Sequence, residues 1–130
     1  MKSSPITRLL SLTLLLVSTE AILVPHKVHI IVYNDLGPRK TLTIHCKSKN
    51  NSLGIRHVAY GHYYQFKFRP NFLRNTLFYC SMKWDRRVHR FDIYVQARDR
   101  AVCETCVWKV RPDGPCLFAY NRVCYSWNPA

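Results

Sequence analysis

Short runs in which every second residue is apolar recur along most of this chain. Cys106, Trp108 and Val110 occupy alternate positions. A period of two places these sulfur and apolar side chains on one face of a strand, and such a face belongs in a core. Pro112 and Gly114 follow, and both residues are typical of tight turns. The pattern therefore predicts a core strand that ends in a turn.

The same alternation predicts further strands. In residues 41–46 it places Leu42, Ile44 and Cys46 on one face. In residues 76–84 it places four apolar residues on one face, which we expect to be the deepest part of the core: Phe78, Cys80, Met82 and Trp84. Other predicted strands cover residues 27–33, 55–60, 63–68 (with Tyr64, Phe66 and Phe68 on one side) and 88–95.

The end of the chain predicts a closing hairpin. Residues 116–120 and 123–127 flank Asn121 and Arg122, which we expect to form a two-residue turn. In that register Cys116 lies near Trp127, and Ala119 lies near Cys124. No segment shows a clear helical period. Short strands separated by polar turns predict an all-β fold, a small disulfide-bonded antiparallel β-sandwich of about eight strands.

The first residues have the features of a secretory signal peptide. Lys2 and Arg8 form a positive start, residues 9–17 are apolar, and Thr19 and Ala21 supply small residues at a cleavage site. The apolar run is far shorter than the about 20 residues that span a bilayer. We therefore expect a signal peptide at 1–21 and a single β-sandwich domain at 22–130, secreted to the extracellular space without a transmembrane segment. A buried N-terminal helix is the alternative.

The charge predicts an acidic partner. Removal of residues 1–21 lowers the net charge only from +13 to +12. A cationic protein of this kind is attracted to an acidic receptor patch, a wall polysaccharide or a membrane surface. We expect no nucleic-acid partner. The plainer alternative is that the charge only maintains solubility.

The arginines in predicted loops are the candidate contact residues. The planar guanidinium suits carboxylates and phosphates. The candidate loops are residues 47–54, 85–87 and 96–100, and the candidate residues are Arg86, Arg87, Arg98 and Arg100. The alternative is a solvated basic rim.

The cysteines predict disulfides. Six are present: Cys46, Cys80, Cys103, Cys106, Cys116 and Cys124. A Cys-x-x-Cys pair also suits redox chemistry or half of a zinc site, but the required βαβ setting and ligand spacing are absent, and export favours disulfides. We expect Cys80 to pair with Cys106, because both lie on apolar faces of core strands, and Cys46 with Cys116 is a further candidate.

The remaining polar motifs give no catalytic site. Six histidines suggest a secreted ribonuclease, yet they are scattered, and we interpret them as solvated strand residues. The acidic residues show no glycosidase pair, and no Gly-x-Ser-x-Gly motif is present. We predict no catalytic, cofactor-binding or metal-binding residue. Asn50-Asn-Ser52 is a sequon, so Asn50 is a candidate glycosylation site.

Taken in order, these stretches resemble the plant self-incompatibility protein S1 family, also called S-protein homologues. The resemblance covers nearly all of the mature chain. It rests on Val28-x-Ile30-x-x-Tyr33-Asn34, on Leu42-x-Ile44-His-Cys-Lys-Ser-Lys49 with Leu53-Gly54, on Tyr64-x-Phe66-x-Phe68, on Thr76-Leu-Phe-x-Cys80, on Phe91-Asp-Ile-Tyr94, and on Cys106-x-Trp108 with Asp113-Gly-Pro-Cys116. The chain departs from the family at Asn50-Asn51, where members often carry acidic residues.

The resemblance implies a secreted, disulfide-bonded sandwich of two antiparallel sheets. It implies no catalytic residues. Poppy members act as stigma-secreted ligands for a membrane protein on pollen, whereas most others have no assigned role. We therefore expect a non-enzymatic extracellular ligand, a monomer, recognised by a cell-surface receptor. The alternative is a cationic defence protein that acts on membranes or cell walls.

Overall fold

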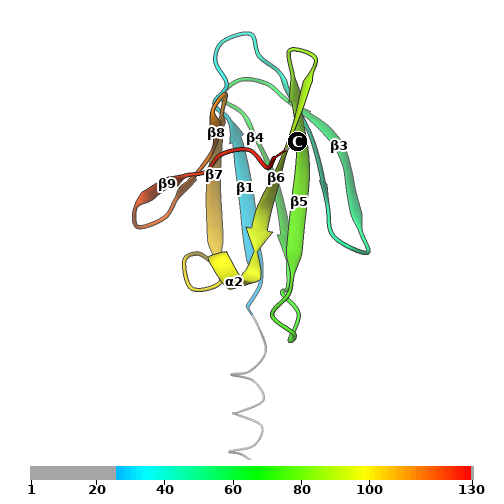
Figure 1. The fold of residues 1–130 in the computed structure, drawn as a ribbon, viewed down its shortest axis with the longest axis vertical. Helices are drawn as coiled ribbons and strands as arrows, with labels where there is room; N and C mark the ends of the chain where they lie inside the picture. The colour runs from blue at the N-terminus through cyan, green and yellow to red at the C-terminus, as the bar shows by residue number, and fades with distance from the viewer. Residues whose placement is uncertain (1–25, 130) are drawn as a thin grey trace, which may run out of the picture.

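The computed structural model describes residues 26–129, so the predicted signal peptide lies outside the described residues. These residues form strands joined by short loops and one short helix (Figure 1). The elements are β1 (Val28–Asn34), β2 (Leu42–Lys47), β3 (Ser52–Val58), β4 (Tyr63–Phe68), β5 (Leu77–Trp84), β6 (Arg87–Val95), α2 (Gln96–Asp99), β7 (Thr105–Arg111), β8 (Gly114–Phe118) and β9 (Arg122–Cys124). Within residues 26–129 no helix has the length and apolar character to cross a bilayer.

The strands form two facing sheets, which confirms the predicted all-β fold. One sheet has the order β4-β1-β7-β8-β9 and the other has the order β3-β2-β5-β6. The pairing is antiparallel except between β1 and β7, which run parallel with Ile30 opposite Cys106 and Val32 opposite Trp108. This parallel pair differs from the expected antiparallel sheets. It arises because β7 follows α2 and returns from the other sheet, so no hairpin fixes its direction.

The core contains the faces that the alternation predicted. Leu42, Ile44 and Cys46 are buried, as are Phe78, Cys80 and Met82, while Trp84 is half-buried. Trp108 is fully buried at the centre of β7, and its ring meets that of Phe91 edge-on at 5.2 Å between centroids. Burial of such large apolar side chains is the main favourable term in folding.

A β-bulge in β6 interrupts the alternation. Phe78 pairs with Tyr94, but Cys80 pairs with Phe91, so β6 has one extra residue at this point. A bulge turns consecutive side chains toward the same side of a sheet. Ile93 and Tyr94 are consequently both fully buried, which simple alternation does not predict.

The disulfides differ from the predicted pairing. The six cysteines pair as Cys46–Cys80, Cys103–Cys106 and Cys116–Cys124. Cys46 lies directly opposite Cys80 on the neighbouring strands β2 and β5 of the same sheet. The predicted partners Cys80 and Cys106 lie on strands of different sheets, as do Cys46 and Cys116, and each of these cysteines is already bonded to a cysteine of its own sheet or loop. Both expected pairings are therefore wrong.

The closing hairpin also has a different register. Cys116 pairs with Cys124, and Phe118 pairs with Arg122, so the loop has three residues and the predicted turn at Asn121 and Arg122 is wrong. Beyond β9 the chain crosses to the second sheet, where the Asn128 N–H donates to the Arg90 carbonyl at 2.8 Å. The C-terminal segment thus ties β8 to β6 (Figure 1).

Two further predictions are wrong in detail. β3 begins at Ser52, inside the polar loop predicted for residues 47–54, because Ser52 pairs with Lys47 on β2. Residues 96–99, predicted as part of a charged loop, form α2, in which Gln96 and Asp99 are buried.

Candidate functional site

The predicted contact loops lie at opposite ends of the sandwich. Asp85 and Arg86 form the β5–β6 turn, next to the β1–β2 loop, and we call this the hairpin end. Residues 48–51, residues 69–76 and α2 lie at the other end, which we call the helix end (Figure 1). The structure therefore does not combine the candidate arginines into one site.

The hairpin end presents basic residues on a strained turn. Trp84 pairs with Arg87, so the loop between β5 and β6 has only two residues. Both have positive φ, 50° at Asp85 and 65° at Arg86, as in a type I′ turn. Glycine and asparagine favour this conformation, whereas an arginine is strained in it. Backbone strain at an exposed arginine points to a role for Arg86 outside folding.

Two residues that the sequence analysis missed extend this basic cluster. Arg39, in the β1–β2 loop, is exposed and has a φ of 65°. The ammonium group of Lys40 contacts the Asp85 carboxylate at 2.5 Å, so the two loops are connected. The resulting cluster consists of Arg39, Lys40, Arg86 and Arg87. The signal in the sequence that could have identified this loop is the Gly37-Pro38 pair, which is typical of turns and directly precedes Arg39 and Lys40.

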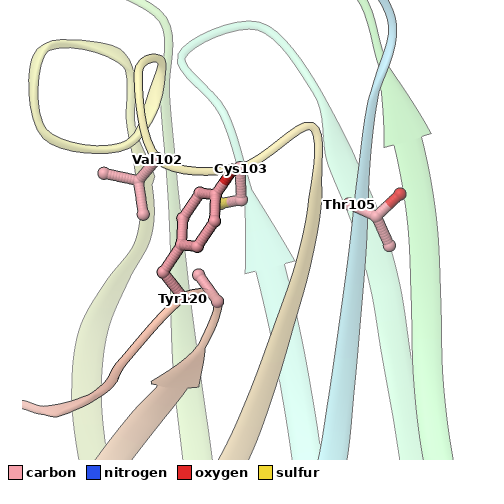
Figure 2. A pocket seen from close by; sticks show the side chains of 5 residues that line it. Val102, Cys103, Thr105 and Tyr120 are labelled. Atoms are coloured by element: carbon pink, nitrogen blue, oxygen red, sulfur yellow. The ribbon is translucent and has the colours of Figure 1, made fainter.

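The helix end contains a shallow hollow of about 240 Å³ beside the Cys103–Cys106 disulfide. Val102, Cys103, Thr105, Ala119 and Tyr120 line it, and Tyr120 projects over Cys103 (Figure 2). This volume is below the about 300–1,000 Å³ of typical small-molecule pockets. Within residues 26–129 no three His, Cys, Asp or Glu side chains are arranged to hold a metal ion.

Four of the six histidines hydrogen-bond to neutral neighbours or stack on aromatic rings, His29 through Gln65 at 2.7 Å. His45 Nε2 lies 2.8 Å from the Ser52 hydroxyl, and His57 Nδ1 lies 3.0 Å from the Thr43 hydroxyl. His89 stacks against the rings of Trp84 and Trp127, which also contact each other. His29, His45, His57 and His89 lie on strands as predicted, and these contacts add neighbours to side chains that we interpreted as solvated.

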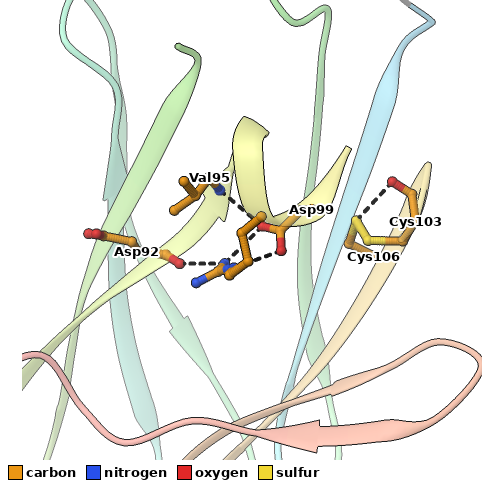
Figure 3. Close-up of polar contacts among 6 residues, drawn as sticks. Asp92, Val95, Asp99, Cys103 and Cys106 are labelled. Carbon is orange, nitrogen blue, oxygen red and sulfur yellow. Dashed lines mark hydrogen bonds and ion pairs between the residues drawn. A yellow bond between two sulfur atoms is a disulfide. The ribbon is translucent and has the colours of Figure 1, made fainter. Parts of the chain in front are cut away.

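Arg98, predicted as a partner contact, makes structural contacts that hold much of its side chain. Its Nε lies 2.7 Å from Oδ1 of Asp99, whose side chain is only 1% exposed, and its Nη2 donates to the Asp92 carbonyl at 2.8 Å (Figure 3). The guanidinium also lies 4.9–5.4 Å from the ring centres of Phe91, Trp108 and Tyr125. Cation–π contacts of this kind add to the ion pair. Arg100, by contrast, is exposed, and its side chain stays a candidate contact.

The buried Asp99 affects its neighbours. Its Oδ2 accepts a hydrogen bond from the Val95 N–H at 2.9 Å, which fixes the start of α2. Burial raises the pKa of Tyr94 above its ordinary value, the negative charge of Asp99 adds to this, and Arg100 acts in the opposite direction. The phenol of Tyr94 is buried and has no hydrogen-bond partner among the described residues.

A second exposed feature of the helix end was missed by the sequence analysis. The β4–β5 loop, residues 69–76, presents Phe72 and Leu73 with exposed fractions of 70% and 81%. The available signal was an adjacent pair of large apolar residues inside an otherwise polar loop.

Comparisons with known proteins identify relatives of this chain. The family described as "Plant self-incompatibility protein S1" matches residues 29–127. The chain is similar to S-protein homolog 5 of Arabidopsis thaliana, with 48% identity over 87 residues that cover 67% of this chain and 68% of the relative. It is also similar to S-protein homolog 2 of Arabidopsis thaliana, with 40% identity over 120 residues that cover 85% of this chain and 74% of the relative.

A solved structure shows the same fold. It is described as a structure of SPH (Self-Incompatibility Protein Homologue) proteins, "a widespread family of small, highly stable, secreted proteins from plants". It matches with a TM-score of 0.61 and 18% identity, covering 81% of this chain and 97% of that chain. The family match and the two relatives confirm the resemblance seen in the sequence motifs: the chain belongs to the plant self-incompatibility protein S1 family.

Proposed function

We propose that this protein is a secreted, monomeric and non-enzymatic ligand that a cell-surface receptor recognises through the hairpin end. The observation that carries the proposal is Arg86, an exposed arginine held at a φ of 65° where glycine is favoured. Such strain persists where the surrounding structure enforces it, and it is common at recognition sites. Family membership and the secreted relatives support this role.

The fold supports recognition rather than catalysis. Three disulfides and two packed sheets form a stable scaffold, and binding residues are often displayed on loops that such a scaffold positions. Arg87 follows Arg86, and the Lys40–Asp85 contact connects their turn to the loop that carries Arg39, so an acidic receptor patch is the complementary surface. The cluster contains no paired general acid and base.

A charge-matched pair of variants tests this proposal. Arg86→Glu with Arg87→Glu changes the hairpin end, while Lys67→Glu with Arg122→Glu makes the same change in net charge at exposed positions of the other sheet. We expect labelled wild-type protein to bind cells of the responsive tissue saturably. The first variant should lose at least about tenfold in affinity, because removing charges at a contact also introduces repulsion. Equal losses in both variants would show that only net charge matters.

A second candidate function, a cationic defence protein acting on membranes or walls, is favoured by the exposed Phe72 and Leu73. It predicts growth inhibition or vesicle leakage that fades as salt screens the charge. A receptor ligand should instead keep its saturable binding to one cell type at a salt concentration that abolishes vesicle leakage. Leakage without saturable cell binding would favour the defence role.

We also infer that Asn50 carries an N-linked glycan. Asn50 is exposed in the loop between β2 and β3, so its amide is accessible. Protein secreted from plant cells should lose mass on enzymatic deglycosylation, and Asn50→Gln should lose that shift. An unshifted wild-type protein would contradict the inference.

A further inference from the structure

The β4–β5 loop ends in an apolar tip. Phe72 and Leu73 are adjacent in sequence, and both are more exposed than the other large apolar side chains of residues 26–129 except Tyr120. Single exposed apolar residues are common on protein surfaces. An adjacent pair at the tip of a loop forms a small contiguous apolar patch, which is a candidate interaction site.

The loop is ordered by its own hydrogen bonds. The Asn71 side chain donates to Asn75 Oδ1 at 2.7 Å, and the Asn71 N–H donates to the Thr76 hydroxyl at 2.8 Å. Gln96 of α2 is only 2% exposed and anchors the loop to the two sheets. Its side-chain Oε1 accepts a hydrogen bond from the Thr76 N–H, and its backbone N–H donates to the Thr76 carbonyl, both at 3.1 Å. The exposure of the tip is therefore a fixed property of the loop, and little order has to be gained on binding.

Basic residues surround this tip. Arg69 and Arg74 flank it in sequence, and both are exposed. Lys27, just before β1, and Arg100, just after α2, are exposed. The start of β1 and α2 lie at the same end of the sandwich as this loop (Figure 1). Glu104 is the exposed acidic residue of the segment between α2 and β7. An apolar tip within a cationic rim matches the surface of an anionic bilayer, which combines an apolar interior with negative headgroups.

We propose that the β4–β5 loop is a membrane-docking site for anionic lipid. Phe72 and Leu73 enter the headgroup region, and Arg74 and its basic neighbours contact lipid phosphates. A protein partner fits less well, because a convex tip of two side chains is small compared with the about 800 Å² that each partner buries in a standard interface. This site goes beyond receptor recognition, since it uses the opposite end of the sandwich.

Matched variants separate this loop from general surface effects. Phe72→Ser with Leu73→Ser removes the tip. Ile55→Ser with Val88→Ser removes two exposed apolar side chains, 56% and 51% exposed, from β3 and β6, the two edge strands of one sheet. Arg74→Gln and Arg86→Gln form a second matched pair, since these arginines have similar φ values of 60° and 65° at opposite ends.

The measurement is cosedimentation with vesicles of phosphatidylcholine alone or of phosphatidylcholine with phosphatidylserine. We expect the wild-type protein to bind the anionic vesicles, and the tip variant to bind them at least about tenfold more weakly. Arg74→Gln should weaken binding more than Arg86→Gln, and the Ile55 and Val88 variant should bind like wild type. Unchanged unfolding curves for all variants establish that each one is folded.

Three results would overturn the proposal. Wild-type protein that does not bind anionic vesicles excludes the site. Equal losses in the tip variant and its control indicate a general effect of exposed apolar surface rather than insertion of this loop. A tip variant that binds vesicles normally but loses binding to cells indicates a protein partner. Because Arg86 and Arg87 lie at the other end, failure of this proposal leaves the receptor test unaffected.

Discussion

Arg98 and Asp99, adjacent in sequence, form an ion pair in which the carboxylate is buried and the guanidinium is enclosed by aromatic rings. The side chain of Asp99 is 1% exposed and that of Arg98 is 24% exposed. The pair lies between the two sheets, because Arg98 contacts Phe91 of β6 and Trp108 of β7. One basic side chain thus connects α2, both sheets and the C-terminal segment.

Removal of Arg98 should destabilise the protein. In Arg98→Ala the Asp99 carboxylate stays buried without its cation, and breaking a buried pair in this way costs about 3 kcal/mol of unfolding free energy. Urea denaturation measures the change. Arg100→Ala is the control and should change stability by less than about 0.5 kcal/mol, because this side chain is exposed. Similar values for both variants would contradict the structural role of Arg98.

The disulfides should differ in their contributions to stability. Cys46–Cys80 closes a loop with a sequence separation of 34, whereas Cys103–Cys106 closes one of 3. Loop-closure entropy predicts a loss of about 4 kcal/mol when the first is replaced by alanines and about 1.6 kcal/mol for the second. Unfolding of the two double variants tests this order. The reverse order would mean that native packing at Cys103 outweighs the loop entropy.

Much of the fold was predictable from local pattern. The alternation at Leu42, Ile44 and Cys46, or at Trp108 and Val110, identifies both the strand and its buried face, because a strand places alternate side chains on opposite sides. The predicted strand limits were close to the observed ones for the same reason. The bulge in β6 was not predictable, since the extra residue there depends on the pairing with β5.

Long-range relationships were harder to predict. Apolar faces show that Cys46, Cys80 and Cys106 are buried, but they do not show which strands are neighbours, and only strand order distinguishes the possible disulfides. Arg98 and Arg100 look alike in sequence, yet one pairs with buried Asp99 and the other is exposed. The sequence therefore identified basic loops without separating structural arginines from displayed ones.

Alanine at Gly114 should be more disruptive than alanine at Gly37. Both glycines have positive φ, 146° and 124°, but a Cβ at Gly114 would lie 1.9 Å from the Tyr125 carbonyl oxygen, whereas Gly37 has open space. Backbone strain alone costs about 1–3 kcal/mol. We expect Gly37→Ala to show this cost, and Gly114→Ala to lose at least about 2 kcal/mol more, because the C-terminal segment must move. Equal losses in urea denaturation would contradict the close contact with Tyr125.

Tyr94→Phe should stabilise the protein, most clearly at alkaline pH. The phenol is buried without a hydrogen-bond partner among the described residues, so its removal should gain about 1 kcal/mol at neutral pH. Because burial and then Asp99 raise the pKa of Tyr94 in the folded state, the neutral phenol is favoured there. That stability is present below the pKa of an unfolded tyrosine, about 10, and is lost as pH rises through the folded-state pKa.

The alkaline part of this prediction has its own control. Tyr64 also has a pKa raised by burial, opposed by Arg56, but its side chain is only half-buried. Tyr64→Phe should therefore flatten the alkaline loss of stability less than Tyr94→Phe does. Unfolding free energies measured from neutral pH to above pH 10 provide the comparison, and identical pH profiles for wild type and Tyr94→Phe would contradict the assignment.

Arg86→Gly should separate stability from recognition. Asp-Gly is a favoured sequence for a type I′ turn, and glycine at a φ of 65° removes the strain, so the variant should gain about 0.5–1 kcal/mol in unfolding free energy. If Arg86 is retained for its partner, the same variant should bind responsive cells more weakly than wild type. Arg74→Gly is the control, because it relieves a similar φ of 60° at the opposite end. The Arg74→Gly control should gain stability while keeping receptor binding. Undiminished cell binding by Arg86→Gly would mean that the strained arginine contributes nothing to recognition.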